Sequence, residues 1–235
     1  MREPKFYRRF DYPKTLLPNA YLASLEEGVT TVDEARARTG ATIGYPGWLV
    51  IYSLLLSSLK PGQHHVLVET GTNVGASTIM LAQALADAGV DGVIHTFEID
   101  EETQKIAKAN IEAAGHAERV NFHLGDTRSV FGRTLTSLNA SISGAFLDGG
   151  HEETVLLNEF EVVRPYLGRG ALVFIDNTYP IAEVEKGEDR RVNEALRSIL
   201  ASHGGSLINL PFVSWFTPGL AIWQADPPLE IADWE

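Results

Sequence analysis

The sequence predicts an α/β protein with a mostly parallel sheet, wound on both faces by helices. From residue 65 onward, short runs rich in β-branched and aromatic residues alternate with segments whose apolar residues recur at helical spacing. Such alternation is typical of strand–helix–strand units, whose crossovers are right-handed. A chain of 235 residues is long for one domain and short for two. We therefore expect an N-terminal helical cap or arm over residues 1–60 and one main domain over residues 61–235.

The N-terminal segment is expected to contain two helices. Residues 31–39 have the composition of a short helix, and residues 48–59 form the longest apolar run of the chain. The second helix is expected to end at residues 60–62, because Lys-Pro-Gly is a strong stop signal. Its apolar run is too short to span a bilayer.

The main domain is expected to alternate strands with helices and to close with a pair of strands. Each strand run is short and apolar, and each helical segment carries apolar residues three and four positions apart. The expected strands are residues 66–68, 93–97, 120–124, 142–147 and 171–175, followed by the closing runs 206–210 and 220–223. The expected helices are residues 77–88, 101–114, 127–138, 153–166 and 188–202.

Composition excludes several classes of protein. The net charge of −12 argues against a protein that binds a nucleic-acid backbone, since such proteins usually present a basic face. The chain has no cysteine, which excludes disulfide scaffolds, thiolate metal sites and cysteine nucleophiles. The first residues lack the apolar core of a secretory signal. We expect a cytoplasmic protein that does not enter a membrane.

Ligands of such sheets bind at the carboxyl ends of the strands, so the residues that follow each strand matter most. The first strand is followed by a glycine turn, E-T-G-T-N-V-G-A-S over residues 69–77. This turn lacks the third glycine of a dinucleotide fingerprint and the Gly-Lys-Ser/Thr of a P-loop. A cofactor site and an ordinary strand-to-helix turn explain it about equally well.

Two acidic residues follow the second and third strands. Glu98 lies at the distance from the glycine turn at which a carboxylate can accept hydrogen bonds from both hydroxyls of a ribose, although a solvated acid would also be found there. Asp126 could accept a hydrogen bond from an exocyclic amine such as that of adenine, or cap the helix that follows. Asp100, before Glu101 and Glu102, has the pattern of a helix cap.

The fourth and fifth strands are followed by a set of oxygen donors. Asp148, Asp176 and Asn177 follow adjacent apolar strands, where they can converge on a hard divalent ion such as Mg²⁺. Alternatively, these residues could cap the helices that follow. His151 lies three residues after Asp148 and could act as a general base near neutral pH, or be a surface histidine at a helix start.

Taken together, these strand-end residues resemble those of class I S-adenosylmethionine (SAM)-dependent methyltransferases. More narrowly, the chain resembles metal-dependent small-molecule O-methyltransferases of the catechol and caffeoyl-coenzyme A type. It is also similar to a bacterial group with an Asp-Gly-x-His segment after the fourth strand, here residues 148–151. The resemblance covers about residues 45–225. It implies a Rossmann-like, seven-stranded sheet whose last strand is antiparallel.

The resemblance also implies a role for each strand-end residue. His151 and Asp148 would be catalytic, and Asp148 would in addition border the cofactor. The residues implied are Glu69, Gly71, Thr72, Asn73, Gly75 and Ser77 along the methionine part of SAM, Glu98 at its ribose, Asp126 and Thr127 beside its adenine, and Asp148, Asp176 and Asn177 around the metal.

One departure bears on the substrate. The catechol-type enzymes have a lysine where this chain has His151, which puts a catechol substrate in doubt. We expect a hydroxyl of a small metabolite in a tailoring pathway as the methyl acceptor, and a homo-oligomer formed through the cap. Four aromatic residues are candidates to line the acceptor pocket, although core packing is at least as good an explanation: Tyr45, Trp48, Tyr179 and Trp215.

Three other functions compete with this interpretation. A relative with the same fold could catalyse hydroxylase-like or cyclase-like chemistry with the same metal site. A non-catalytic interaction domain is disfavoured, because a decayed site need not keep its polar strand-end residues. A nucleic-acid methyltransferase is disfavoured by the net charge and by Asp-Gly-Gly-His in place of an Asn/Asp-Pro-Pro-Tyr/Phe segment after the fourth strand.

Overall fold

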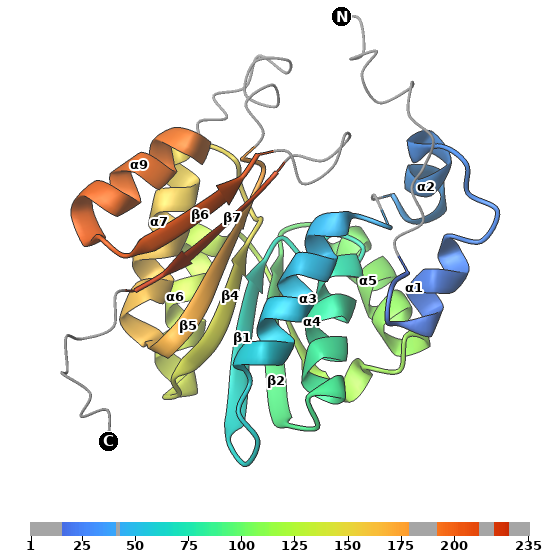
Figure 1. Cartoon of the computed structure of the whole chain (residues 1–235), viewed down its shortest axis with the longest axis horizontal. Coiled ribbons are helices and arrows are strands. Elements are labelled where there is room, and N and C mark those ends of the chain that lie inside the picture. Colours follow the sequence, from blue (N-terminus) through green and yellow to red (C-terminus); the bar gives the residue numbers. More distant parts are fainter. Residues whose placement is uncertain (1–15, 41–42, 179–191, 212–218, 226–235) are drawn as a thin grey trace, which may run out of the picture.

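The computed structural model describes residues 16–40, 43–178, 192–211 and 219–225. Its centre is a seven-stranded sheet in the order β3-β2-β1-β4-β5-β7-β6 (Figure 1). Neighbouring strands from β3 to β5 are parallel, and β7 is antiparallel to both β5 and β6. This arrangement confirms the predicted sheet, including its antiparallel last strand. Within the described ranges, no helix has both the length and the apolarity needed to cross a bilayer.

The strands lie where the sequence predicts them, and several are longer. The longest extension is in β5, which begins four residues before the predicted run and ends on Asp176. The strands are β1 (His64–Thr70), β2 (Asp91–Glu98), β3 (Val120–Leu124), β4 (Ile142–Leu147), β5 (Leu167–Asp176), β6 (Ser206–Leu210) and β7 (Leu220–Gln224).

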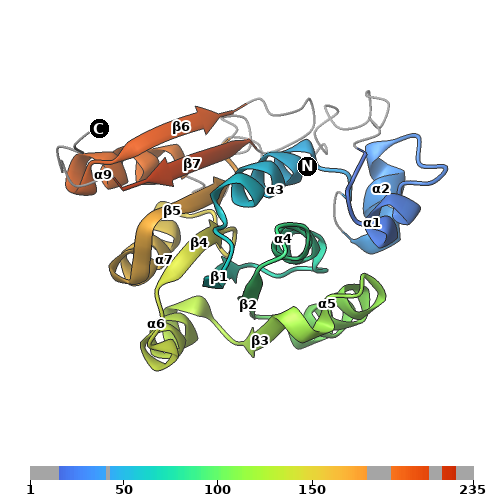
Figure 2. The same ribbon diagram turned by 60° about the horizontal axis from the view of Figure 1, so that its bottom comes forward.

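Helices cover both faces of the sheet (Figure 2). One face is covered by α3 (Pro46–Ser58), α4 (Ala76–Asp87) and α5 (Glu101–Ala113). The opposite face is covered by α6 (Thr127–Leu138), α7 (Glu153–Val163) and α9 (Val192–His203). The short helix α1 (Ala20–Leu25) lies beside α5, where its Tyr21 hydroxyl donates to Asn110 Oδ1 at 2.6 Å, and α2 (Val32–Thr39) lies next to α1.

The core consists of two apolar layers, one on each face of the sheet. Successive side chains of a strand point to opposite faces. In β5, Phe174 therefore packs with α3 and α4, whereas Val173 and Ile175 pack with α7 and α9. Because helices cover both faces, the stretches 66–68 of β1, 144–147 of β4 and 171–175 of β5 are continuously apolar.

Three local features differ from the predicted elements. The predicted strand 66–68 continues to Thr70, so Glu69 belongs to the strand and not to the turn. The predicted helix 153–166 ends as an α-helix at Val163 and closes in a 3₁₀ turn over Arg164–Tyr166 that contains a proline. Helix α1 was not predicted; it has only six residues, too few for a clear apolar period, and it begins at the cap Asn19.

The packing of α7 against β7 gives a first testable prediction. Phe160 is fully buried and meets the ring of Trp223 edge-on at a centroid distance of 4.9 Å. Truncation of a buried phenylalanine leaves a cavity and costs about 3–5 kcal/mol, so Phe160→Ala should lower the free energy of unfolding in urea by that amount. The control Ile208→Ala removes a side chain that is 60% exposed on the edge strand and should change it by less than about 0.5 kcal/mol. Equal effects of the two variants would contradict this account of the core.

Candidate functional site

The loop after β1 lies against the ends of β2 and β4. The N–H groups of Gly71 and Thr72 donate to the Phe97 carbonyl at 2.9 and 3.0 Å. Gly71 has a φ of +79°, and a Cβ atom there would lie 2.2 Å from the Asp148 carbonyl oxygen. Only glycine fits this position, for both conformational and steric reasons. The glycine of the predicted turn therefore allows two strand ends to touch.

Glu69 lies beneath this loop and is fully buried. Its carboxylate accepts hydrogen bonds from the hydroxyls of Ser77 and Thr96, each at 2.6 Å, and from that of Thr78. Burial raises the pKa of Glu69 to about 7, although the three hydroxyl donors oppose this shift. Thr72 is also buried and shares a 2.6 Å hydrogen bond with Thr96. Glu69, Thr72 and Ser77 were predicted at the methionine part of SAM. Their side chains form hydrogen bonds that join the loop and α4 to β1 and β2.

Glu98, the last residue of β2, faces the glycine loop as predicted. One carboxylate oxygen accepts the N–H of Asn73 at 2.8 Å, and the other accepts the N–H groups of Ile99 and Asp100 at 2.8 and 3.0 Å. Asn73 and Gly75, both with positive φ, complete the turn into α4. Asp100 caps α5 by accepting from Thr103 N, which confirms the predicted cap.

The ends of the first four strands enclose an open cleft of about 230 Å³. It is lined by Gly71, Phe97, Glu98, Ile99, Gly125, Asp126, Thr127, Arg128, Gly149, Gly150, Glu152 and Val155. Asp126 caps α6 through the N–H of Arg128 at 2.9 Å and also binds the Arg128 guanidinium. Asp126 thus serves as a helix cap and borders the cleft at the same time.

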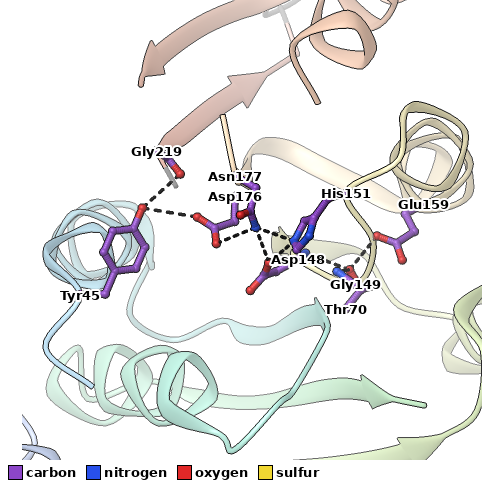
Figure 3. Close-up of polar contacts among 9 residues, drawn as sticks. All are labelled: Tyr45, Thr70, Asp148, Gly149, His151, Glu159, Asp176, Asn177 and Gly219. Carbon is purple, nitrogen blue, oxygen red and sulfur yellow. Dashed lines mark hydrogen bonds and ion pairs between the residues drawn. The ribbon is translucent and has the colours of Figure 1, made fainter. Parts of the chain in front are cut away.

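A polar cluster lies next to this cleft, where β4 and β5 end (Figure 3). It brings together Asp148, His151, Asp176 and Asn177, as the sequence predicts. Asp148 Oδ1 lies 3.1 Å from His151 Nε2 and 3.3 Å from Asn177 Nδ2. The same Asn177 amide nitrogen contacts His151 Nε2 and lies 3.2 Å from Asp176 Oδ2. Asn177 adopts a φ of +61°, which turns its side chain back toward the end of β4.

The electrostatics of the cluster suit a cation. Burial, and then the carboxylates of Glu69 and Glu159, raises the pKa of Asp148 well above its usual range. Burial and the charge of Asp148 do the same for Asp176. Among the described residues no three His, Cys, Asp or Glu side chains converge as ligands; the candidate set is two carboxylates and an amide. This set fits a hard divalent ion, because a positive charge would relieve the repulsion between two partly desolvated carboxylates.

The aromatic residues predicted at the acceptor pocket divide into two pairs. Tyr45 and Trp48 are 3% and 8% exposed and pack edge-on at a centroid distance of 5.6 Å. The Tyr45 hydroxyl donates to the Gly219 carbonyl at 3.1 Å and lies 3.4 Å from Asp176 Oδ1, so Tyr45 touches the polar cluster itself. Tyr179 and Trp215 lie outside the described residues.

The sequence reasoning missed Glu159, a buried acid of α7 beside the cleft. Its carboxylate accepts the hydroxyls of Thr70 and Thr127, each at 2.8 Å. Burial raises its pKa to about 7. A signal was present in the sequence: Glu159 occupies an apolar position of its helix, between the core residues Leu156 and Phe160.

Comparison with known proteins gives one family match and several structures of similar fold. Residues 68–178 match the family model of a methyltransferase domain. No curated protein matches the sequence. The O-methyltransferase TomG from Streptomyces achromogenes, involved in tomaymycin synthesis and solved in complex with SAM, is 19% identical, with 94% of each chain covered and a TM-score of 0.64.

Two further solved structures have a similar fold. The O-methyltransferase from Bacillus cereus, in complex with SAH, is 21% identical over 90% of this chain and 93% of that chain, with a TM-score of 0.65. The SAH-bound methyltransferase PaMTH1 from Podospora anserina is 12% identical over 93% and 90%, also with a TM-score of 0.65. The predicted resemblance to SAM-dependent methyltransferases and the predicted Rossmann-like fold are thereby confirmed.

The burial of Glu69 gives a prediction about stability. Its folded-state pKa of about 7 lies above the ordinary value of 4.5, so the folded protein holds this proton more tightly than the unfolded chain. The resulting stability is present below pH 4.5 and is lost as the pH rises through 7, by up to about 3 kcal/mol. Urea unfolding at pH 5 and pH 8 should therefore show a smaller loss in Glu69→Gln than in the unmodified protein. Identical losses would show that Glu69 is already ionised at pH 5.

Proposed function

We propose that this methyltransferase transfers the methyl group of SAM to a hydroxyl of a small metabolite, with a divalent metal bound by Asp148, Asp176 and Asn177 and with His151 as the general base. One observation carries the proposal: the cofactor cleft and the polar cluster share the segment that follows β4. Gly149 and Gly150 line the cleft, whereas Asp148 and His151 belong to the cluster. A methyl donor in the cleft would thus lie beside an acceptor held at the cluster.

SAM as the donor is supported by the cleft and by solved structures of the same fold. The structures from Streptomyces achromogenes and Bacillus cereus contain SAM and SAH, respectively. In the present chain, Glu98 lines the cleft with its carboxylate. A carboxylate offers about four lone-pair sites, so Glu98 can keep its three backbone donors and still accept from a ribose hydroxyl.

His151 is suited to take the proton of the acceptor. Its Nε2 atom contacts both the Asp148 carboxylate and the Asn177 amide, and these two contacts at one ring nitrogen fix the orientation of the ring. A nearby carboxylate also stabilises the imidazolium that forms when the proton arrives. In the reaction, the acceptor oxygen forms a bond to the methyl carbon, the carbon–sulfur bond breaks with its electron pair on sulfur, and the acceptor proton passes to His151.

The metal would supply one effect, a lower pKa of the acceptor hydroxyl. The chain's own residues supply the rest. Asp148 and Asp176 provide the anionic oxygens, and the Tyr45 hydroxyl near Asp176 Oδ1 limits the rotation of that carboxylate. Alignment of acceptor and donor by these fixed groups lowers the barrier further, because little orientation remains to be lost in the transition state.

The cofactor site can be tested by calorimetry with SAH. We expect SAH to bind the unmodified protein and Glu98→Ala to weaken binding at least tenfold, because a hydrogen bond to a charged group contributes about 1.5–3 kcal/mol. Glu118→Ala is the matched control and should leave the affinity unchanged. This exposed glutamate precedes β3, at the amino-terminal ends of the strands and so at the end of the sheet away from the cleft. Failure of the unmodified protein to bind SAH would refute the proposed function.

The roles of His151 and the metal can be tested by transfer of labelled methyl groups from SAM to a panel of phenols and sugar hydroxyls. His151→Ala should lower turnover by roughly 10²–10⁴-fold, as expected for loss of a general base, and leave SAH affinity nearly unchanged. EDTA should suppress turnover and Mg²⁺ should restore it. His64→Ala is the control, because His64 is the first residue of β1 and lies at the end of the strand away from the site. Full turnover of His151→Ala would remove His151 as the base, and full turnover in EDTA would remove the metal.

A further inference from the structure

The carboxylate of Glu159 lies beneath the floor of the cleft, in a position that its helix would normally fill with an apolar side chain. Its neighbours on the same face of α7 are Leu156, Phe160 and Val163, all buried. Removal of a carboxylate from water costs several kcal/mol unless hydrogen bonds replace the lost solvation. A residue kept at such a cost in a core position is a candidate for a role in the adjacent site.

Thr70 links Glu159 to the segment that carries Asp148. The Thr70 hydroxyl donates to Glu159 Oε2 at 2.8 Å and accepts the N–H groups of Asp148 and Gly149 at 3.2 and 3.1 Å (Figure 3). Since the hydroxyl proton points to Glu159, the oxygen lone pairs point to the two N–H groups. Glu159 therefore sets the direction of the hydroxyl that holds the start of the loop after β4.

Thr127 links the other carboxylate oxygen to the adenine side of the cleft. Its hydroxyl donates to Glu159 Oε1 at 2.8 Å, and it is the first residue of α6, next to Asp126. A Cβ atom on Gly149 would lie 2.5 Å from Glu159 Oε1. Glycine at position 149 thus leaves room for the carboxylate to reach both threonines.

We propose that Glu159 is a positioning residue that holds two walls of the cofactor cleft at a fixed separation, the Asp148–Gly149 wall through Thr70 and the Asp126–Thr127 wall through Thr127. This inference rests on the proposed function only in naming the ligand of the cleft. Its physical basis is that the two oxygens of one carboxylate accept from two hydroxyls, that of Thr127, which belongs to one wall, and that of Thr70, which in turn accepts the N–H groups of the other wall. Displacement of one wall relative to the other breaks a hydrogen bond in this chain of contacts.

An isosteric amide separates this role from simple packing. Glu159→Gln keeps the volume of the side chain but replaces one acceptor oxygen by an N–H₂ donor. One of the two threonine hydroxyls must then accept instead of donate. If Thr70 turns, its proton faces the N–H groups of Asp148 and Gly149. Gly149 then loses its hydrogen bond to Thr70 without any cavity, whereas Asp148 keeps the bond from its N–H to the Thr70 carbonyl at 3.1 Å.

The first test is SAH binding by calorimetry. Glu159→Gln, Thr70→Val and Thr127→Val should each raise the dissociation constant of SAH about tenfold, because a cleft whose walls are in the binding position only about a tenth of the time binds its ligand more weakly by that factor. Thr70→Ser, which keeps the hydroxyl, should restore most of the affinity that Thr70→Val loses. Thr134→Val is the matched control, because Thr134 lies on α6 and donates only to its own helix at Val130 O. The double variant Thr70→Val/Glu159→Gln should bind SAH at most twofold more weakly than Glu159→Gln does, because both changes break the same linkage.

The second test needs no ligand. Amide hydrogen exchange of Gly149, whose N–H donates to the Thr70 hydroxyl, should be faster in Glu159→Gln and Thr70→Val than in the unmodified protein and in Thr134→Val. Exchange and affinity equal to those of the unmodified protein in both variants would overturn the positioning role, as would Thr70→Ser behaving like Thr70→Val. Absence of SAH binding in the unmodified protein would refute the proposed function instead, and the exchange experiment would still decide the role of Glu159.

Discussion

The close contact between Gly71 and the Asp148 carbonyl oxygen is the constraint on which the site depends. β1 and β4 are neighbours in the sheet, and their register pairs Thr70 with Leu147, so the two following loops leave the sheet side by side. A side chain at position 71 would force these loops apart, because its Cβ would lie 2.2 Å from the carbonyl oxygen. With glycine there, the loop that borders the cofactor cleft and the loop that carries the polar cluster form one continuous surface.

Two buried carboxylates stabilise this surface from below, and they do so in similar ways. Glu69 accepts hydroxyls from α4 and β2, whereas Glu159 accepts hydroxyls from the end of β1 and the start of α6. In both cases short hydroxyl side chains join a central acid to separate elements. Such an arrangement tolerates little displacement, because each oxygen is already engaged and a broken contact would leave a buried charge unsatisfied. Rigidity of this kind is what a site needs when the reaction depends on alignment.

Much of the fold and the convergence of the polar cluster could be predicted from the sequence, and the reason is geometric. The carboxyl ends of parallel strands lie at one end of a sheet, so Glu98, Asp148 and Asp176 had to lie along that end once the strands were assigned, with Asp148 and Asp176 on the neighbouring strands β4 and β5. What could not be predicted was the direction of each side chain. Thr127 turns inward to Glu159, and Asp126 is engaged by Arg128. Glu159 was missed because the acidic residues of a helix are ordinarily expected on its solvent-exposed face. Its threonine partners lie 89 and 32 positions away in the chain, so the sequence near Glu159 does not reveal them.

The orientation of Asn177 connects the electrostatics of the cluster to its chemistry. Its amide nitrogen faces both Asp148 and Asp176, the orientation that two neighbouring carboxylates favour. A cation between the same carboxylates would favour the opposite orientation, with the amide oxygen of Asn177 toward the ion, because the attraction between the ion and this oxygen would then dominate. Asn177 adopts a left-handed backbone conformation that asparagine tolerates better than most residues, at the end of a strand whose side chains alternate between the two core layers. The residue type therefore satisfies two demands at once: a backbone that turns sharply out of β5, and a short side chain that can present either a donor or an acceptor to a pair of acids.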